Sequence, residues 1–192
     1  IVLLEPEIPS NTGNIGRTCL VTGSRLHLIE PMGFIINDRN LKRAGMDYWK
    51  DIDAVIYDSW RDFLIRNAEN INITPAMLET AGLSSGLSLE EAAAFKQRDE
   101  APKLWMSTTK ALNTYDQADF RDGDYIMFGK ESAGIPEEIL MADPPRAVRI
   151  PMQSGKRSLN LSNSVAIVLY EALRQNKFQD LELMGQLHWH RW

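Results

Sequence analysis

Short apolar runs alternating with helical stretches are the feature of this sequence that most constrains its fold. Six runs are predicted to be strands because each is short, apolar and closed by turn residues: residues 1–4, 25–29, 54–57, 104–107, 125–128 and 148–150. The clearest helix is Leu161–Gln175, whose apolar side chains recur at helical spacing. Strands that alternate with helices are typical of βαβ units, so we expect an α/β fold with a parallel sheet flanked by helices.

The composition narrows the class of protein further. The chain has 192 residues, of which 44% are hydrophobic and 24% charged, as expected for one soluble globular domain covering residues 1–192. No apolar run approaches the roughly 18 residues that a membrane helix needs, so we expect no membrane partner. The single cysteine, Cys19, cannot form an internal disulfide, which favours a reducing, cytoplasmic location.

Turn and cap residues predict several helix boundaries. A helix over residues 15–22 is expected to end at Gly23, and Ser59 is expected to cap the helix that follows the third strand. Asp38 is expected to cap a basic helix that ends at Gly45. These boundaries leave the loops that follow the strands available for a binding site.

The net charge of −5, taken over the whole chain, argues against a nucleic-acid partner. Most of this charge is confined to two segments, however. Residues 67–103 hold six acidic and three basic side chains, and residues 178–192 carry a further −1, so the rest of the chain carries only −1. We interpret 67–103 as an acidic helical insertion that decorates the surface or contacts a protein, and 178–192 as a tail that packs on the body or on a partner chain. The remaining body is close to neutral and compatible with RNA.

The loop over residues 9–17 follows the first predicted strand, at the edge where parallel sheets bind ligands. The amides of Asn11 and Asn14 offer hydrogen-bond donors and acceptors to a ligand. Gly13 allows a close backbone approach, and Arg17 offers a guanidinium to a phosphate or a ribose. The same residues also fit a turn, an N-cap and a surface arginine, and the sequence leaves both interpretations open.

Two further loops follow strands, at residues 128–136 and 150–163. In the first, Gly129 suits a ligand that passes against bare backbone, and Glu131 supplies charge. In the second, more hydroxyl and amide side chains lead into the last helix and its first turn than one N-cap requires, and two basic residues accompany them: Ser154, Lys156, Arg157, Ser158, Asn160, Ser162 and Asn163. An ordinary strand-to-helix turn and an over-capped helix remain the alternatives.

Other chemistries have weaker support in the sequence. No phosphate-binding loop, dinucleotide fingerprint or hydrolase nucleophile elbow occurs. The histidines, at positions 27, 188 and 190, lack the spacing of a metal site with a second cluster, so we expect no metal.

Together the loops resemble the SPOUT superfamily of RNA 2′-O-methyltransferases, most closely its YibK-type (TrmL) group, which methylates the wobble ribose of cytidine or uridine in tRNA. The resemblance covers about three quarters of the chain. It is carried by E-P-E-I-P-S-N-T-G-N-I-G-R, R-L-H-L-I-E-P-M-G-F, L-K-R-A-G-M-D-Y, S-T-T-K, D-G-D-Y-I-M-F-G-K-E-S-A-G-I-P and R-S-L-N-L-S-N-S-V-A-I-V-L-Y.

The resemblance implies a C-terminal deep trefoil knot, a homodimer with Tyr170 at its interface, and the anticodon arm of tRNA as partner. It implies that S-adenosylmethionine lies in the knot, held at positions that match Ser107, Gly129, Ile150, Met152, Ser158, Leu159 and Asn160. The catalytic positions that match are Arg17, Glu131, Ser158 and Asn160. Contacts to the RNA are expected from Asn11, Asn14, Arg17, Lys42, Arg43 and Arg157.

The implied chemistry needs a group that takes or holds the proton of a ribose hydroxyl, which is a weak nucleophile near neutral pH. The sulfonium methyl is already activated, so no metal is required. Because a guanidinium is protonated in neutral water, we leave open whether Arg17 acts as a base or as a positioning group. Two other functions also stay open: methylation of another position in tRNA or ribosomal RNA, and a catalytically silent protein that binds RNA or cofactor.

Overall fold

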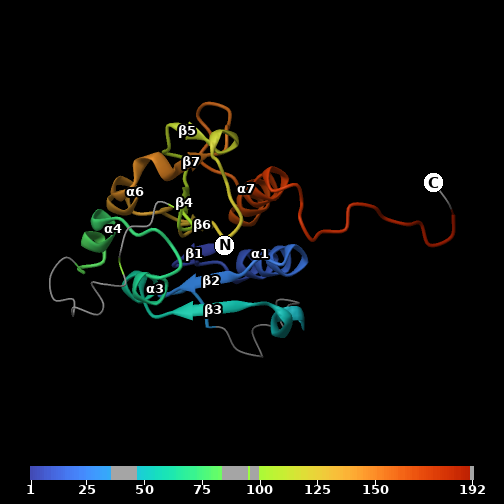
Figure 1. Cartoon of the computed structure of the whole chain (residues 1–192), viewed down its shortest axis with the longest axis horizontal. Helices are drawn as coiled ribbons and strands as arrows, with labels where there is room; N and C mark the ends of the chain where they lie inside the picture. Colours follow the sequence, from blue (N-terminus) through green and yellow to red (C-terminus); the bar gives the residue numbers. More distant parts are fainter. Residues whose placement is uncertain (36–46, 84–94, 96–99, 191–192) are drawn as a thin grey trace.

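The computed structural model describes residues 1–35, 47–83, 95 and 100–190 (Figure 1). Within these ranges it contains seven strands: β1 Val2–Leu4, β2 Leu26–Ile29, β3 Ala54–Tyr57, β4 Leu104–Ser107, β5 Asn113–Thr114, β6 Tyr125–Phe128 and β7 Ala147–Arg149. The helices are α1 Pro9–Thr22, α3 Trp60–Arg66, α4 Pro75–Thr80, α6 Glu137–Ala142 and α7 Leu161–Gln175, with 3-10 turns η1 Asp47–Asp51, η2 Tyr115–Gln117 and η3 Pro144–Arg146. No helix in these ranges is long and apolar enough to cross a membrane.

All described strands belong to one sheet, in the order β3-β2-β1-β6-β4-β7-β5. Every pairing between neighbours is parallel, which confirms the predicted α/β class. The six predicted strands are present within a residue or two of their expected bounds. The additional strand, β5, has two residues, too few for an apolar pattern to predict it.

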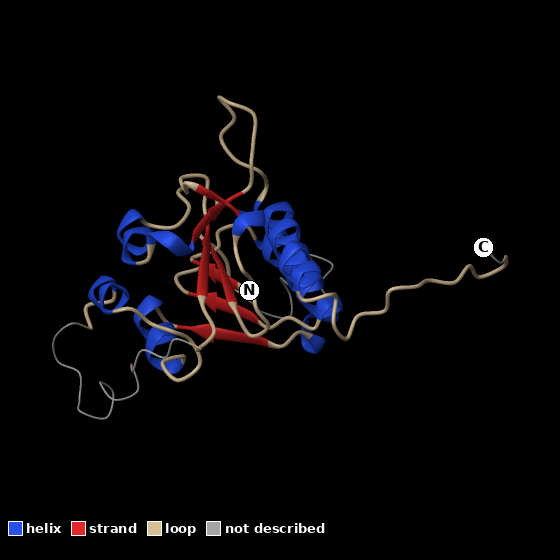
Figure 2. Cartoon of the chain, turned by 45° about the horizontal axis from the view of Figure 1, so that its top comes forward, coloured by secondary structure: helices blue, strands red, loops and turns tan. Residues whose placement is uncertain are grey.

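Helices cover both faces of the sheet (Figure 2). One core lies under α3, α4 and α6, and the other lies under α1 and α7, which pack side by side. Successive side chains of β1 enter opposite cores, since Val2 and Leu4 pack in the first and Leu3 in the second. A strand buried on both faces explains why β1 consists of apolar residues alone.

Two predicted helix boundaries are confirmed and one is wrong. Gly23 ends α1 in the left-handed conformation, with φ of 69°, and the Ser59 hydroxyl accepts from the backbone N–H of Asp62 at the start of α3. The first helix, however, begins at Pro9 rather than at residue 15. The predicted loop over residues 9–17 is therefore the first nine residues of the 14-residue helix α1. The basic helix expected after Asp38 lies outside the described residues.

The segment predicted to be a peripheral acidic insertion contributes to the core over its first part. Ile71, Ile73, Met77 and Leu83 are all buried in the core under α3, α4 and α6. The expectation that this part decorates the surface is therefore wrong, because its apolar side chains face inward while its acidic ones face solvent. Residues 84–94 and 96–99 of the segment lie outside the described residues.

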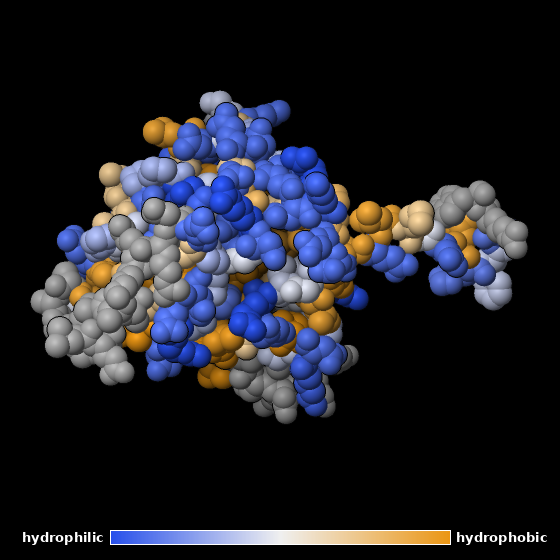
Figure 3. All heavy atoms as spheres, in the orientation of Figure 1, coloured by the Kyte–Doolittle hydropathy of each residue, from blue (hydrophilic) through white to orange (hydrophobic). Residues whose placement is uncertain are grey.

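The C-terminal tail runs away from the body as far as it is described (Figures 1 and 3). The Trp189 side chain is 91% exposed, and Leu183 and Met184 are exposed as well. Packing of these residues on their own body, one of the two expectations for the tail, is therefore not found.

Candidate functional site

A cavity of about 630 Å³ lies at the carboxyl ends of β4, β6 and β7. Its walls come from the loops that follow these strands, at residues 107–110, 128–134 and 150–152, and from residues 157–161 at the start of α7. This is the end of a parallel sheet at which ligands bind. The volume falls in the range of small-molecule and cofactor sites.

The structure brings most of the predicted site residues to this cavity. Its lining includes Asn11, Ser107, Gly129, Glu131, Ile150, Met152, Arg157, Ser158, Leu159 and Asn160. Of the remaining ones, Asn14, Arg17 and Tyr170 lie elsewhere on the exposed surface, and Lys42 and Arg43 fall outside the described residues. The three loops that the sequence singles out thus meet at one place.

The loop after β6 is fastened to the loop after β1 by charged and polar side chains. Lys130 forms a 2.7 Å ion pair with Glu5, and the Ser132 hydroxyl donates to the Glu7 carboxylate at 2.8 Å. The hydrogen bonds from Ser132 lower the pKa of Glu7, and the Glu5 carboxylate raises the pKa of Lys130. Both pairs are partly or fully exposed, so they align the two loops more than they stabilise the fold.

Glu131 contributes the central contact between these two loops. One of its carboxylate oxygens accepts from the backbone N–H of Glu7 at 2.8 Å. The other accepts from the side-chain amide of Asn11 at 2.9 Å and from the backbone N–H of Ile8 at 3.3 Å. Because Ile8 has no side-chain oxygen with which to cap α1, a carboxylate distant in sequence holds the backbone that leads into this helix.

Asn11 extends this contact to the last helix. Its amide oxygen accepts from the side-chain amide of Asn160 at 2.9 Å, and the Asn160 oxygen accepts from the backbone N–H of Ser162 at 2.9 Å as the N-cap of α7. Asn11 is only 5% exposed. Its side chain therefore faces inward, toward Glu131 and Asn160, and not toward a surface-bound RNA as the sequence leads us to expect.

Gly129 is required to be a glycine by the protein's own backbone. A Cβ at this position would overlap the backbone of Gly134 and Ile135, which folds back over the end of β6. This requirement is independent of the predicted passage of a ligand against the Gly129 backbone, which stays a prediction. Gly129 still lines the cavity, so its backbone remains accessible there.

Arg17 lies on the exposed side of α1, outside the cavity of its own chain. Its guanidinium carbon lies 5.5 Å from the centre of the Tyr48 ring. The Tyr48 hydroxyl in turn donates to the backbone carbonyl of Gly13 at 3.0 Å. Tyr48 lies in one of the matching motifs, L-K-R-A-G-M-D-Y, but the sequence pattern alone indicates no role for this residue.

Two groups that often carry chemistry are buried away from the cavity. Burial raises the pKa of the Cys19 thiol to about 11, so its thiolate is scarce at neutral pH. His27 packs inside the protein, where its Nδ1 lies 2.8 Å from the Tyr57 hydroxyl. In the part of the chain that the structure describes, no three histidine, cysteine or acidic side chains are grouped as metal ligands would be.

Known proteins are similar to this chain in both sequence and fold. The model of the SpoU rRNA Methylase family matches residues 1–170. The tRNA (cytidine(34)-2'-O)-methyltransferase of Escherichia coli (strain K12) is 42% identical over 176 residues, which cover 91% of this chain and 92% of that protein.

Two solved structures have a similar fold. One, reported as "Structural insights into the 2-OH methylation of C/U34 on tRNA", is 36% identical with a TM-score of 0.68, and the match covers 92% of this chain and 94% of that one. The SpoU methyltransferase AviRb from Streptomyces viridochromogenes, in complex with the cofactor AdoMet, is 20% identical with a TM-score of 0.62, covering 92% of this chain and 59% of that one. With a family match over most of its length, the chain belongs to the SpoU rRNA methylase family.

Proposed function

We propose that this protein transfers the methyl group of S-adenosylmethionine to the 2′-hydroxyl of the wobble ribose in tRNA. The observation that carries the proposal is the convergence of the predicted cofactor residues on one cavity, beside the hydrogen-bonded chain Glu131–Asn11–Asn160. The Escherichia coli relative, which is 42% identical and of nearly the same extent, is named for this activity.

The cavity residues fit S-adenosylmethionine in size and in chemistry. Ile150, Met152 and Leu159 offer apolar surface to a flat base, while Ser107 and the backbone at Gly129 offer polar groups. With Ser158 and Asn160, these residues would hold the cofactor. When bound, it supplies a methyl group on a sulfonium, which is a strong electrophile. The ribose hydroxyl that takes up this methyl group must be aligned with it and must give up its proton.

Glu131 and Asn160 shape the cavity in this proposal. The two oxygens of Glu131 already accept three hydrogen bonds, so the carboxylate holds the wall in place. Asn160 fixes the start of α7 through its oxygen and Asn11 through its nitrogen. Both side chains therefore keep the walls of the cavity in one geometry, as a reaction that depends on alignment requires.

Arg17 and Arg157 supply the contacts to RNA. Both are exposed, and a guanidinium donates to a phosphate or to a developing alkoxide through a rigid fork of N–H groups. Lys42 and Arg43, outside the described residues, complete the expected basic set. Contacts of this kind make the affinity for tRNA fall with added salt.

We further propose that the protein works in the cytoplasm as a homodimer whose C-terminal part is tied in a trefoil knot. Tyr170 is 46% exposed on α7 and Val21 is 61% exposed on α1, which packs beside α7, and exposed apolar side chains on these two helices support an apolar contact between two copies. The knot rests on membership of the SpoU rRNA methylase family and on the resemblance of the loops to the knotted SPOUT enzymes. Sedimentation of the Tyr170→Asp variant tests the dimer, since a stable monomer is expected.

Methyl transfer from labelled cofactor to total tRNA and ribosomal RNA tests the activity. We expect label on tRNA only, mapped by mass spectrometry to the wobble ribose, and no label with the Arg17→Ala variant. Label at another nucleotide would support the same chemistry on a different target. Cofactor binding without transfer to any RNA would support a silent binding protein and contradict the proposal.

A further inference from the structure

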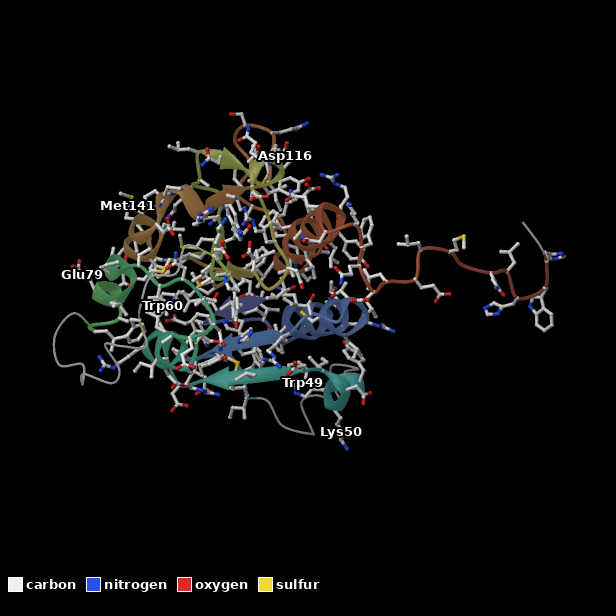
Figure 4. The ribbon with its side chains drawn as sticks, viewed as in Figure 1. Trp49, Lys50, Trp60, Glu79, Asp116 and Met141 are labelled. Atoms are coloured by element: carbon white, nitrogen blue, oxygen red, sulfur yellow. The ribbon has the colours of Figure 1, made fainter. Side chains whose placement is uncertain are left out.

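The turn η1 packs tightly on α1 at two glycines. The Tyr48 hydroxyl reaches the carbonyl of Gly13. One helical turn further on, a Cβ at Gly16 would lie 2.7 Å from the Ile52 side chain and 3.4 Å from the Trp49 ring. Lys50, from the same turn, points away from the body (Figure 4). The lack of a side chain at Gly16 therefore lets Trp49 and Ile52 approach the helix, and Tyr48 is held at the contact by its bond to the Gly13 carbonyl.

Tyr48 makes two different contacts through its two ends. Its hydroxyl is anchored to the backbone of α1, while its ring lies 5.5 Å from the guanidinium carbon of Arg17, one turn along the same helix. A guanidinium at this distance from an aromatic ring is attracted by the ring's quadrupole. Among the described residues, no carboxylate lies within ion-pair distance of Arg17.

We propose that Tyr48 is a positioning residue for the methyl transfer, because it sets the direction of the Arg17 guanidinium before RNA binds. The inference rests on the proposed function, in which Arg17 contacts the RNA. A free arginine side chain samples many rotamers, and ordering it only when RNA binds would lower affinity or rate. An anchored ring removes part of this cost in the free protein, since the guanidinium already lies in one direction.

A double-mutant cycle on the full chain tests the inference. The Tyr48→Leu variant should lower kcat/KM for tRNA by about two- to fivefold, the effect expected of an exposed cation–π contact. The Tyr48→Phe variant keeps the ring and should retain more of the activity. Because the Arg17→Ala variant is expected to transfer no methyl group, the cycle is completed with tRNA affinity: Tyr48→Leu should weaken tRNA binding when Arg17 is present and cause no further loss in the Arg17→Ala background. Affinity for S-adenosylmethionine and the unfolding midpoint, measured on every variant, separate positioning from misfolding.

Lys50→Ala is the matched control, because Lys50 belongs to the same turn, is exposed and points away from the body. It should leave kcat/KM unchanged. Equal losses from Tyr48→Leu with and without Arg17, or full activity of Tyr48→Leu, would overturn the inference. If the unaltered protein methylates no RNA, the proposed function fails, but the inference about Tyr48 is still testable. The tRNA affinities of the same four proteins then show whether Tyr48 acts through Arg17.

Discussion

The side-chain amide of Asn160 donates a 2.9 Å hydrogen bond to the amide oxygen of Asn11, across 149 positions of sequence. With the bond from Asn11 to Glu131, it joins the beginning of α1, the loop after β6 and the beginning of α7. All three places contribute to the lining of the cavity. Asn11 is the shared member, so its removal should disturb the other two.

The Asn11→Ala variant should lose stability by about 1–3 kcal/mol, because the Asn160 amide nitrogen loses its partner and Glu131 loses one of its three hydrogen bonds in a partly buried place. Affinity for S-adenosylmethionine should fall with it, since the walls of the cavity are no longer aligned. Urea unfolding and calorimetric titration measure the two effects. The exposed Asn14, on the same helix, provides the control: Asn14→Ala should change neither, and an Asn11→Ala variant of wild-type stability would contradict the account.

The Gly129→Ala variant should be strongly destabilised, because the new methyl group would overlap the backbone of Gly134 and Ile135. The matched control is Gly155→Ala. Gly155 has φ of 76°, and a Cβ added there would meet no heavy atom within 4 Å, so that variant should lose only about 1 kcal/mol from backbone strain. The stabilities of the two variants are compared by thermal unfolding monitored with circular dichroism. Equal losses of stability in the two variants would contradict this prediction, because the backbone of Gly134 and Ile135 would then move away from the new methyl group at little cost in free energy.

Stability should fall as the pH drops below 6.5, in part through His27. Burial lowers the pKa of His27 from 6.5 to about 3, so the unfolded chain takes up a proton at this position that the folded chain refuses. The folded state therefore loses stability from pH 6.5 down to about 3. At pH 5 the loss is on the order of 2 kcal/mol.

Urea unfolding of the wild type and of His27→Gln, at pH 7 and at pH 5, measures this effect. Glutamine keeps a hydrogen-bonding partner for Tyr57 but does not titrate, so the variant should lose less stability than the wild type between the two pH values. The same pH dependence in both proteins would show that His27 does not contribute.

Cys19 should be inert to thiol reagents in the folded protein. Its side chain is buried between α1 and the sheet, and with a pKa of about 11 only about one thiol in a thousand is ionised at pH 8. Absorbance after addition of Ellman's reagent should show negligible reaction without denaturant and one reactive thiol per chain in urea. Rapid reaction of the native protein would mean that α1 opens readily.

The parts of the fold that could be predicted from sequence are those fixed by local patterns. The bounds of α7 follow from the spacing of its apolar side chains, and the start of α3 follows from its N-cap residue, Ser59. The start of α1 could not be found in this way, because Asn11 ordinarily competes with helical hydrogen bonds. Here its amide is bound instead to Glu131, which lies 120 residues away.

The site shows the same division between local and distant causes. Polar loops at strand ends marked the residues that line the cavity, because parallel strands bring such loops to one edge. What each residue does there depends on neighbours that sequence spacing does not reveal. Gly129 makes room for the backbone of Gly134 and Ile135, and the role of Tyr48 is visible only from the packing of η1 against α1.

The most direct measurement of the central claim is methyl transfer to a tRNA that differs at one atom. The purified protein is given labelled S-adenosylmethionine and either a complete substrate tRNA or the same tRNA with a 2′-deoxyribose at the wobble position. We predict transfer to the complete tRNA and none to the deoxy form, because the accepting hydroxyl is missing. Equal transfer to both would contradict the account, since the methyl group would then be placed on another nucleotide.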